Sequence, residues 1–131
     1  MMSFLSGLRG LAGGGRRDID PGWNLPESES DVDALLSGGD KPQLIYKHSF
    51  ACGVCVFSKS AIESKMEQFK KMADLHFVDA RATRSVSDYI ADKTGIKHES
   101  PQALIIKNGK VIWHASHSAI TAGKIMNALE N

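Results

Sequence analysis

The stretch Gln43-Leu44-Ile45-Tyr46-Lys47 leads, through a short loop, to Cys52-Gly53-Val54-Cys55, and this region decides how the rest of the chain is interpreted. The apolar run predicts a short buried strand, and a helix is expected to start at the cysteines. A disulfide between Cys52 and Cys55 would close a very small loop and constrain the unfolded chain little. The spacing therefore favours a bond that is made and broken. A helix start also favours a thiolate, because its dipole and free N–H groups stabilise negative charge.

Length and composition limit the classes of function. The chain has 131 residues, enough for one domain with its own core. Its net charge of +1 gives no strong field that would favour nucleic acid or a membrane surface as a partner. Two cysteines in a chain of this size fit a reducing compartment. Arg9 interrupts the apolar N-terminus and no basic residue precedes it, so no secretory signal is predicted and we expect a cytoplasmic protein.

Two regions are predicted. Residues 1–20, rich in glycine and arginine, are expected to form a flexible tail. Residues 21–131 are expected to form the folded domain. It would begin with a short edge strand at Trp23 and Leu25 and continue with a helix, capped by Ser28 or Ser30, that ends at Gly38-Gly39.

Hydrophobic periodicity predicts the remaining elements. One long amphipathic helix is expected after the cysteines, with Phe57, Phe69 and the methionines in the core. A strand at 75–78, with His76 facing solvent, and a helix ending at Gly95 should follow. Asn108-Gly109 predicts a tight hairpin between 103–106 and 111–113. A last helix would carry Ile120, Ile125, Met126 and Leu129, with Ser116, Ser118 or Thr121 as its cap.

This order of elements, with a Cys-x-x-Cys at a strand-to-helix turn, predicts a thioredoxin-like α/β fold. We expect a central mixed sheet of four to five strands flanked by helices, and a C-terminal antiparallel hairpin followed by a helix. Pro101 stands where that fold places a cis proline opposite the cysteines. The Ser100-Pro101 bond is therefore predicted to be cis.

Three further segments narrow the interpretation: Tyr46-Lys47-His48-Ser49, His98-Glu99-Ser100-Pro101-Gln102, and Trp113-His114-Ala115-Ser116-His117. With them the chain from Trp23 onward resembles the bacilliredoxin family of the bacillithiol system, in its monothiol type. The resemblance implies removal of bacillithiol, a low-molecular-weight thiol, from mixed disulfides on cytosolic proteins. Members commonly carry one cysteine followed by Pro-Ile-Ser, whereas Gly53-Val54-Cys55 follows Cys52 here. The resemblance thus covers Cys52 but not Cys55.

Candidate roles follow from position. Cys52 is the predicted nucleophile and Cys55 the resolving thiol, which would attack the mixed disulfide on Cys52. The loop expected to face them supplies four candidate substrate-binding residues: His98, Glu99, Ser100 and Pro101. His48 is a candidate for lowering the pKa of Cys52 if it is charged and close; its alternative is a hydrogen-bonded structural role. His98 and Glu99 have a solvated turn as their alternative, and His114 and His117 are expected in strand and helix-cap roles.

Other classes remain open at this point. An internal disulfide would also suit a general thioredoxin-like protein disulfide reductase. Cys52 and Cys55 have the spacing of half a zinc site, with five histidines available, and a non-enzymatic adaptor is a further alternative. We predict an enzyme without a cofactor or metal. Its expected partners are oxidised or S-thiolated cytosolic proteins, with a low-molecular-weight thiol or a reductase as electron donor.

Overall fold

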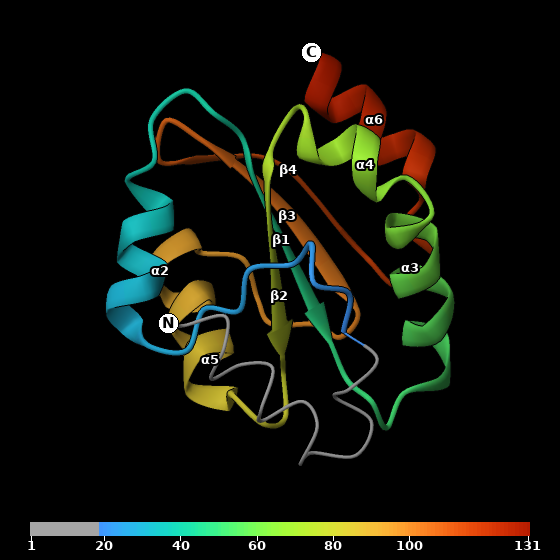
Figure 1. Cartoon of the computed structure of the whole chain (residues 1–131). Coiled ribbons are helices and arrows are strands. Elements are labelled where there is room, and N and C mark those ends of the chain that lie inside the picture. The colour runs from blue at the N-terminus through green and yellow to red at the C-terminus, as the bar shows by residue number, and fades with distance from the viewer. Residues whose placement is uncertain (1–18) are drawn as a thin grey trace.

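The computed structural model describes residues 19–131 and shows a four-stranded sheet between two layers of helices (Figure 1). The strands are β1 (Gln43–His48), β2 (Asp74–Asp79), β3 (Gln102–Lys107) and β4 (Lys110–Ser116). Their order is β2-β1-β3-β4. β1 runs parallel to β2 and antiparallel to β3, and β3 runs antiparallel to β4. The predicted mixed sheet with a C-terminal hairpin is confirmed. Most of the predicted tail, residues 1–18, lies outside the described part of the chain.

The hairpin turn follows the expected chemistry. Asn108 and Gly109 have φ values of 54° and 76°, the left-handed conformations that a type I′ turn requires at both central positions. Asparagine and glycine adopt this conformation with little strain. The predicted turn is therefore confirmed in position and in physical cause.

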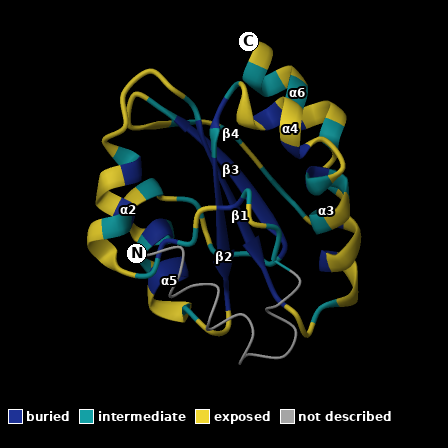
Figure 2. Cartoon of the chain, in the orientation of Figure 1, coloured by how far each residue is buried: buried dark blue, intermediate teal, exposed yellow. Residues whose placement is uncertain are grey.

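Helices cover both faces of the sheet (Figure 1). On one face lie α3 (Gly53–Glu63), α4 (Met66–Lys70) and α6 (Ala122–Glu130), which contribute Ile62, Phe69 and Ile125 to one core cluster. On the other face lie α2 (Glu29–Leu36) and α5 (Arg84–Thr94), which contribute Val32, Leu35, Val86 and Ile90 to a second cluster. Figure 2 shows the strands buried between these layers. Because both faces are covered, β1 is buried at every position, as the continuous apolar run predicted.

The predicted long helix is two helices. α3 ends at Glu63 and α4 starts at Met66. The Ser64 hydroxyl donates to the Ala61 carbonyl at 2.7 Å. It competes there with the backbone N–H groups that would continue the helical hydrogen-bond pattern. The Lys65 N–H then bonds the Ile62 carbonyl, three residues back, which tightens the turn.

Phe57 is a correction to the predicted core. Its side chain is 77% exposed, whereas Phe69 is fully buried. The buried face of α3 consists of Cys55, Ser58 and Ile62, so the core side of this helix begins at the second cysteine and not at Phe57.

The segment before α2 also differs from expectation. Trp23 and Leu25 do not form a strand. Asn24, between them, makes a single parallel β-bridge to His76 of β2. Trp23 is buried in the first core cluster. His76 was predicted to face solvent but is only 8% exposed, because the second face of the sheet is covered as well. Its Nε2 lies 2.7 Å from Oε1 of Gln43.

The register of the sheet brings the two candidate loops together. Lys47 near the end of β1 pairs with Gln102 at the start of β3. The loop that leaves β1 toward Cys52 and the loop that enters β3 from His98 are therefore neighbours. The Ser100-Pro101 peptide bond is cis, as predicted.

A candidate dithiol active site

Cys52 lies at the N-terminus of α3, where a short turn positions it. Its backbone N–H donates to the Ser49 carbonyl at 3.1 Å, and the Ala51 N–H donates to the Ser49 hydroxyl at 3.3 Å. Cys52 is the N-cap residue, with extended backbone angles of φ −110° and ψ 119°. Its side chain is half-buried and free of any disulfide. The chain thus presents this thiol at the positive end of a helix dipole, accessible to a substrate.

Hydrogen bonds favour the thiolate form of Cys52. The Cys55 thiol donates to its sulfur and lowers the Cys52 pKa below the ordinary value of 9.0. Backbone N–H groups of Cys55 and Val54, in the first turn of α3, act in the same direction. Partial burial opposes them, but the net direction is downward. Since the thiolate is the nucleophilic form of cysteine, these surroundings suit Cys52 to the role of a nucleophile.

Cys55 has the opposite environment. It is fully buried, and burial raises its pKa to about 11, with its hydrogen bond to Cys52 adding to the effect. A backbone N–H at Ser49 and the Ser100 hydroxyl act weakly in the other direction. The two thiols are therefore unequal in the reduced protein: Cys52 is half-buried and its surroundings favour the thiolate, whereas Cys55 is fully buried and its surroundings favour the thiol.

Tyr46 supports the helix that carries both thiols. Its hydroxyl donates to the Cys55 carbonyl at 3.1 Å, and Nδ1 of His48 lies 2.9 Å from the same oxygen. A carbonyl only accepts, so the His48 Nδ1–H must donate to the Tyr46 oxygen. Burial raises the pKa of Tyr46 far above its ordinary value, which keeps the hydroxyl protonated and able to donate.

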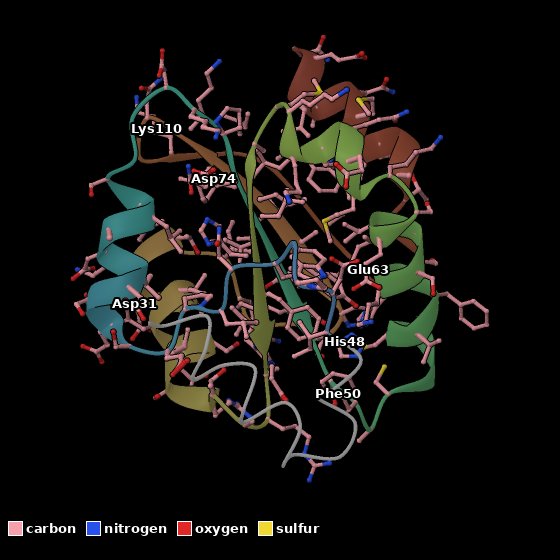
Figure 3. All side chains as sticks on the ribbon, viewed as in Figure 1. Asp31, His48, Phe50, Glu63, Asp74 and Lys110 are labelled. Atoms are coloured by element: carbon pink, nitrogen blue, oxygen red, sulfur yellow. The ribbon has the colours of Figure 1, made fainter. Side chains whose placement is uncertain are left out.

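His48 is buried and neutral. Burial lowers its pKa to about 4, and the nearby positive charge of Lys59 adds to this. Figure 3 shows His48 and Phe50 at the end of the sheet beside α3, and their ring centroids are 4.5 Å apart. The sequence interpretation required a charged His48 to lower the Cys52 pKa. The neutral imidazole does not supply that charge; it anchors Tyr46 instead.

The loop before β3 contributes residues with different partners. His98 Nδ1 lies 2.8 Å from the Ser87 hydroxyl on α5, and Glu99 pairs with His117 at 3.5 Å. Ser100 is the member that meets the thiols: its Oγ lies 3.8 Å from Sγ of Cys55. The Pro101 carbonyl accepts from the His117 N–H at 3.0 Å. The fold therefore joins Ser100 to the cysteines, while the side chains of His98 and Glu99 are bound by neighbouring elements.

The remaining predicted histidines also have defined places. His114 lies exposed on β4. His117 does not cap the last helix: it starts the short 3-10 helix η2 (His117–Ala119), and Thr121 caps α6 by accepting from the Lys124 N–H. Within residues 19–131, no group of three or more His, Cys, Asp and Glu side chains is arranged to hold a metal ion.

Exposed apolar side chains lie on both sides of Cys52 in the chain. Phe50 is 37% exposed and Val54 is 49% exposed. Phe57 follows Val54 by three residues, so both lie on the outer side of α3. We refer to Phe50, Val54 and Phe57 as the apolar rim. Such a rim suits contact with a protein surface.

Sequence reasoning did not identify two residues of this site, Tyr46 and Ser49. Tyr46 was assigned to a buried strand and to a segment that carries the family resemblance, without a role at the site, although the strand's alternation places it on the same face as His48, toward α3. Ser49 is polar and sits in the turn before the nucleophile, where serine often bonds its own backbone. The alternation and this turn preference were the available signals.

Comparisons with known proteins agree with this geometry. The sequence profile described as "Monothiol bacilliredoxin BrxC" matches residues 25–125. A solved protein described as having a thioredoxin fold is 28% identical, with a TM-score of 0.70 over 79% of this chain and 90% of that one. Thioredoxin from Trypanosoma brucei brucei is 19% identical, with a TM-score of 0.67 over 87% and 93% of the two chains. Fasciola hepatica thioredoxin is 14% identical, with a TM-score of 0.65 over 82% and 96%.

The two thioredoxins, at these identities, show the fold alone, whereas the family match spans most of the chain. No helix within residues 19–131 has the length and apolar character needed to cross a membrane. The thioredoxin fold and the accessible Cys52 at the N-terminus of α3 agree with the matched family, and Cys55 is an additional thiol beside it. The chain belongs to the monothiol bacilliredoxin family and is a thiol-disulfide oxidoreductase of thioredoxin-like fold.

Proposed function

We propose that this enzyme reduces mixed disulfides between a low-molecular-weight thiol, bacillithiol or a similar one, and cytosolic proteins. The observation that carries the proposal is the inequality of the two thiols. Cys52 is accessible and favours the thiolate, whereas Cys55 is buried beside it with a pKa of about 11. The family match supports the identity of the small thiol.

The proposed reaction has two steps in which electrons balance. The Cys52 thiolate attacks the sulfur of the small thiol in the mixed disulfide, and the protein leaves as a thiolate. Cys55 then loses its proton and attacks the Cys52 sulfur, which releases the small thiol as a thiolate. The enzyme ends with a Cys52–Cys55 disulfide and has given two electrons to the substrate. A low-molecular-weight thiol or a reductase returns them.

Two of the four loop residues predicted to contact substrate, Ser100 and Pro101, keep that proposed role, which their backbone would fulfil. Ser100 and Pro101 border the thiols directly through the Ser100 contact with Cys55. His98 and Glu99 are tied by their side chains to Ser87 and His117, so we propose that they shape the loop more than they bind substrate. His48 acts in this proposal as the support of Tyr46.

A specific observation favours one second candidate, general protein disulfide reduction. The apolar rim leaves Phe50 37% and Val54 49% exposed next to Cys52. These side chains would stabilise an approaching protein surface whether or not it carries a small thiol, so a protein with an internal disulfide would be accommodated as well.

One experiment separates the two functions. The same target protein is prepared either S-bacillithiolated or with an internal disulfide, and the rate of reduction is measured with the wild-type enzyme, Cys52→Ser and Cys55→Ser. We expect faster reduction of the bacillithiolated form and no reduction by Cys52→Ser. Ser60→Ala, which removes an exposed hydroxyl on α3, is the control. Exclusive reduction of the internal disulfide would overturn the proposed substrate in favour of the second candidate.

A further inference from the structure

Ser100 is the residue of the second loop whose side chain reaches a reacting atom. Its Oγ lies 3.8 Å from Sγ of Cys55, a contact between residues 45 positions apart in the chain. The loop is held on both sides: His98 contacts Ser87 on α5, and the Pro101 carbonyl accepts from the His117 N–H. These attachments fix the backbone around Ser100 and leave its hydroxyl toward the buried thiol.

The resolving step poses a chemical problem at Cys55. In the reduced protein its thiol donates a hydrogen bond to Cys52. Once Cys52 is part of a mixed disulfide, it no longer offers a negative charge to accept that bond. Cys55 must then lose its proton in a site where it is fully buried and where burial opposes the thiolate. An anion formed there needs hydrogen-bond donors from the protein.

The described residues offer Cys55 two donors that favour its thiolate. One is a backbone N–H at Ser49, and the other is the Ser100 hydroxyl; both act to lower the Cys55 pKa. The backbone donor is present whatever the side chain at that position. The Ser100 hydroxyl is a side-chain donor and is therefore open to selective removal.

We propose that Ser100 is a catalytic residue of the resolving step, in which its hydroxyl donates a hydrogen bond to the Cys55 thiolate as that thiolate attacks Cys52. The inference rests on the proposed role of Cys55 as the resolving thiol. The Cys55 proton passes to a base in solution, and the Ser100 proton stays on its oxygen. The electron pair of Cys55 forms the new sulfur–sulfur bond, and the bond from Cys52 to the substrate breaks, with its electrons leaving on the substrate sulfur.

The contribution of Ser100 belongs to the second step. Cys52 attacks as a thiolate stabilised by Cys55 and by backbone N–H groups in α3, a set that does not include Ser100. The first step should therefore proceed at an unchanged rate when the hydroxyl is removed. A hydrogen bond to a charged group is strong enough that its loss should slow the second step by about tenfold or more.

The test uses an aromatic disulfide, dithiobis(nitrobenzoate), whose released thiolate absorbs visible light. Attack by Cys52 releases one equivalent, and resolution by Cys55 releases a second, so stopped-flow absorbance separates the two steps. Wild type is compared with three variants: Ser100→Ala, Ser100→Thr, which keeps the hydroxyl, and the control Ser60→Ala at an exposed position on α3. Far-UV circular dichroism of each variant reports whether it is folded.

The expected result is a normal first phase in all proteins and a second phase slowed about tenfold in Ser100→Ala alone. The pH at which the second phase reaches half of its maximal rate should also rise in that variant. A second phase of equal rate in wild type and Ser100→Ala would overturn this inference and leave the proposed function intact. A wild-type protein that stops after the first phase would overturn the proposed resolving role of Cys55 and the inference with it.

Discussion

Cys52 and Cys55 are three residues apart, yet their surroundings shift their pKa values in opposite directions. Cys52 stands before the first helical turn, where N–H groups have no partners within the helix, and its side chain is half-buried. Cys55 lies within that turn and faces the core. The spacing and the helix start made this inequality predictable from the sequence. The hydrogen bonds from Tyr46 and Ser100 were not, because each partner comes from a strand or loop whose side-chain direction depends on tertiary packing.

The pH dependence of alkylation tests this inequality. Iodoacetamide should modify Cys52 first, with a midpoint below the ordinary pKa of 9.0, because Cys55 donates a hydrogen bond to its thiolate. Replacing Cys55 by alanine removes that donor and should move the midpoint to higher pH. Peptide mass spectrometry across a pH series measures both. Earlier modification of Cys55, or an unmoved midpoint in Cys55→Ala, would contradict the assignment.

At the scale of elements, the predictable features were those with local causes. The Asn108-Gly109 turn and the helix stop at Gly95, with φ 74°, depend on backbone conformations that few residues adopt. The break between α3 and α4 was missed because hydrophobic periodicity continues through it, from Ile62 to Met66 and Phe69. Hydrophobic periodicity shows which face of a helix is buried, but not whether the backbone hydrogen bonds of the helix continue without a break.

The corrected face of α3 gives a prediction about two phenylalanines. Phe57→Ala should change the free energy of unfolding by less than about 0.5 kcal/mol, because Phe57 is 77% exposed. Phe69→Ala should lower it by about 3–5 kcal/mol, because Phe69 is fully buried on α4 and its loss leaves a cavity. Denaturation in urea, followed by circular dichroism, measures both values. Equal losses of stability would show that α3 packs differently.

At the scale of the whole molecule, helices on both faces of the sheet explain why polar strand residues are buried. Lys47, His48 and His76 are all less than 9% exposed. Alternation along a strand tells the two faces apart, but it does not tell whether the second face is covered. The order of elements predicted the fold correctly, yet the environment of His76 depended on α2, α5 and the segment around Asn24.

Buried neutral histidines predict that the protein loses stability in acid. Burial lowers the pKa values of His48 and His76 to about 4, from 6.5. Between these values the unfolded chain binds protons that the folded chain does not, so the free energy of unfolding falls as the pH is lowered from about 6.5 to about 4. Each histidine contributes a slope of about 1.4 kcal/mol per pH unit in that window.

Chemical denaturation at several pH values measures this slope. His76→Asn should reduce it by the share of one histidine, whereas His114→Asn, at an exposed position on β4, should leave it unchanged. If the free energy of unfolding falls with pH at the same slope in wild type and in His76→Asn, the assignment of a buried, neutral His76 is contradicted.

The central claim is that Cys55 resolves a disulfide held on Cys52, and intact mass spectrometry tests it most directly. Reduced protein is mixed with one equivalent of a bacillithiolated peptide, and the reaction is quenched in acid. The mass of the intact protein is then measured without adding a reductant. We predict that wild type loses two hydrogen atoms and carries no adduct, whereas Cys55→Ser retains one bacillithiol on Cys52. A stable bacillithiol adduct on wild type, equal to that on Cys55→Ser, would contradict the claim.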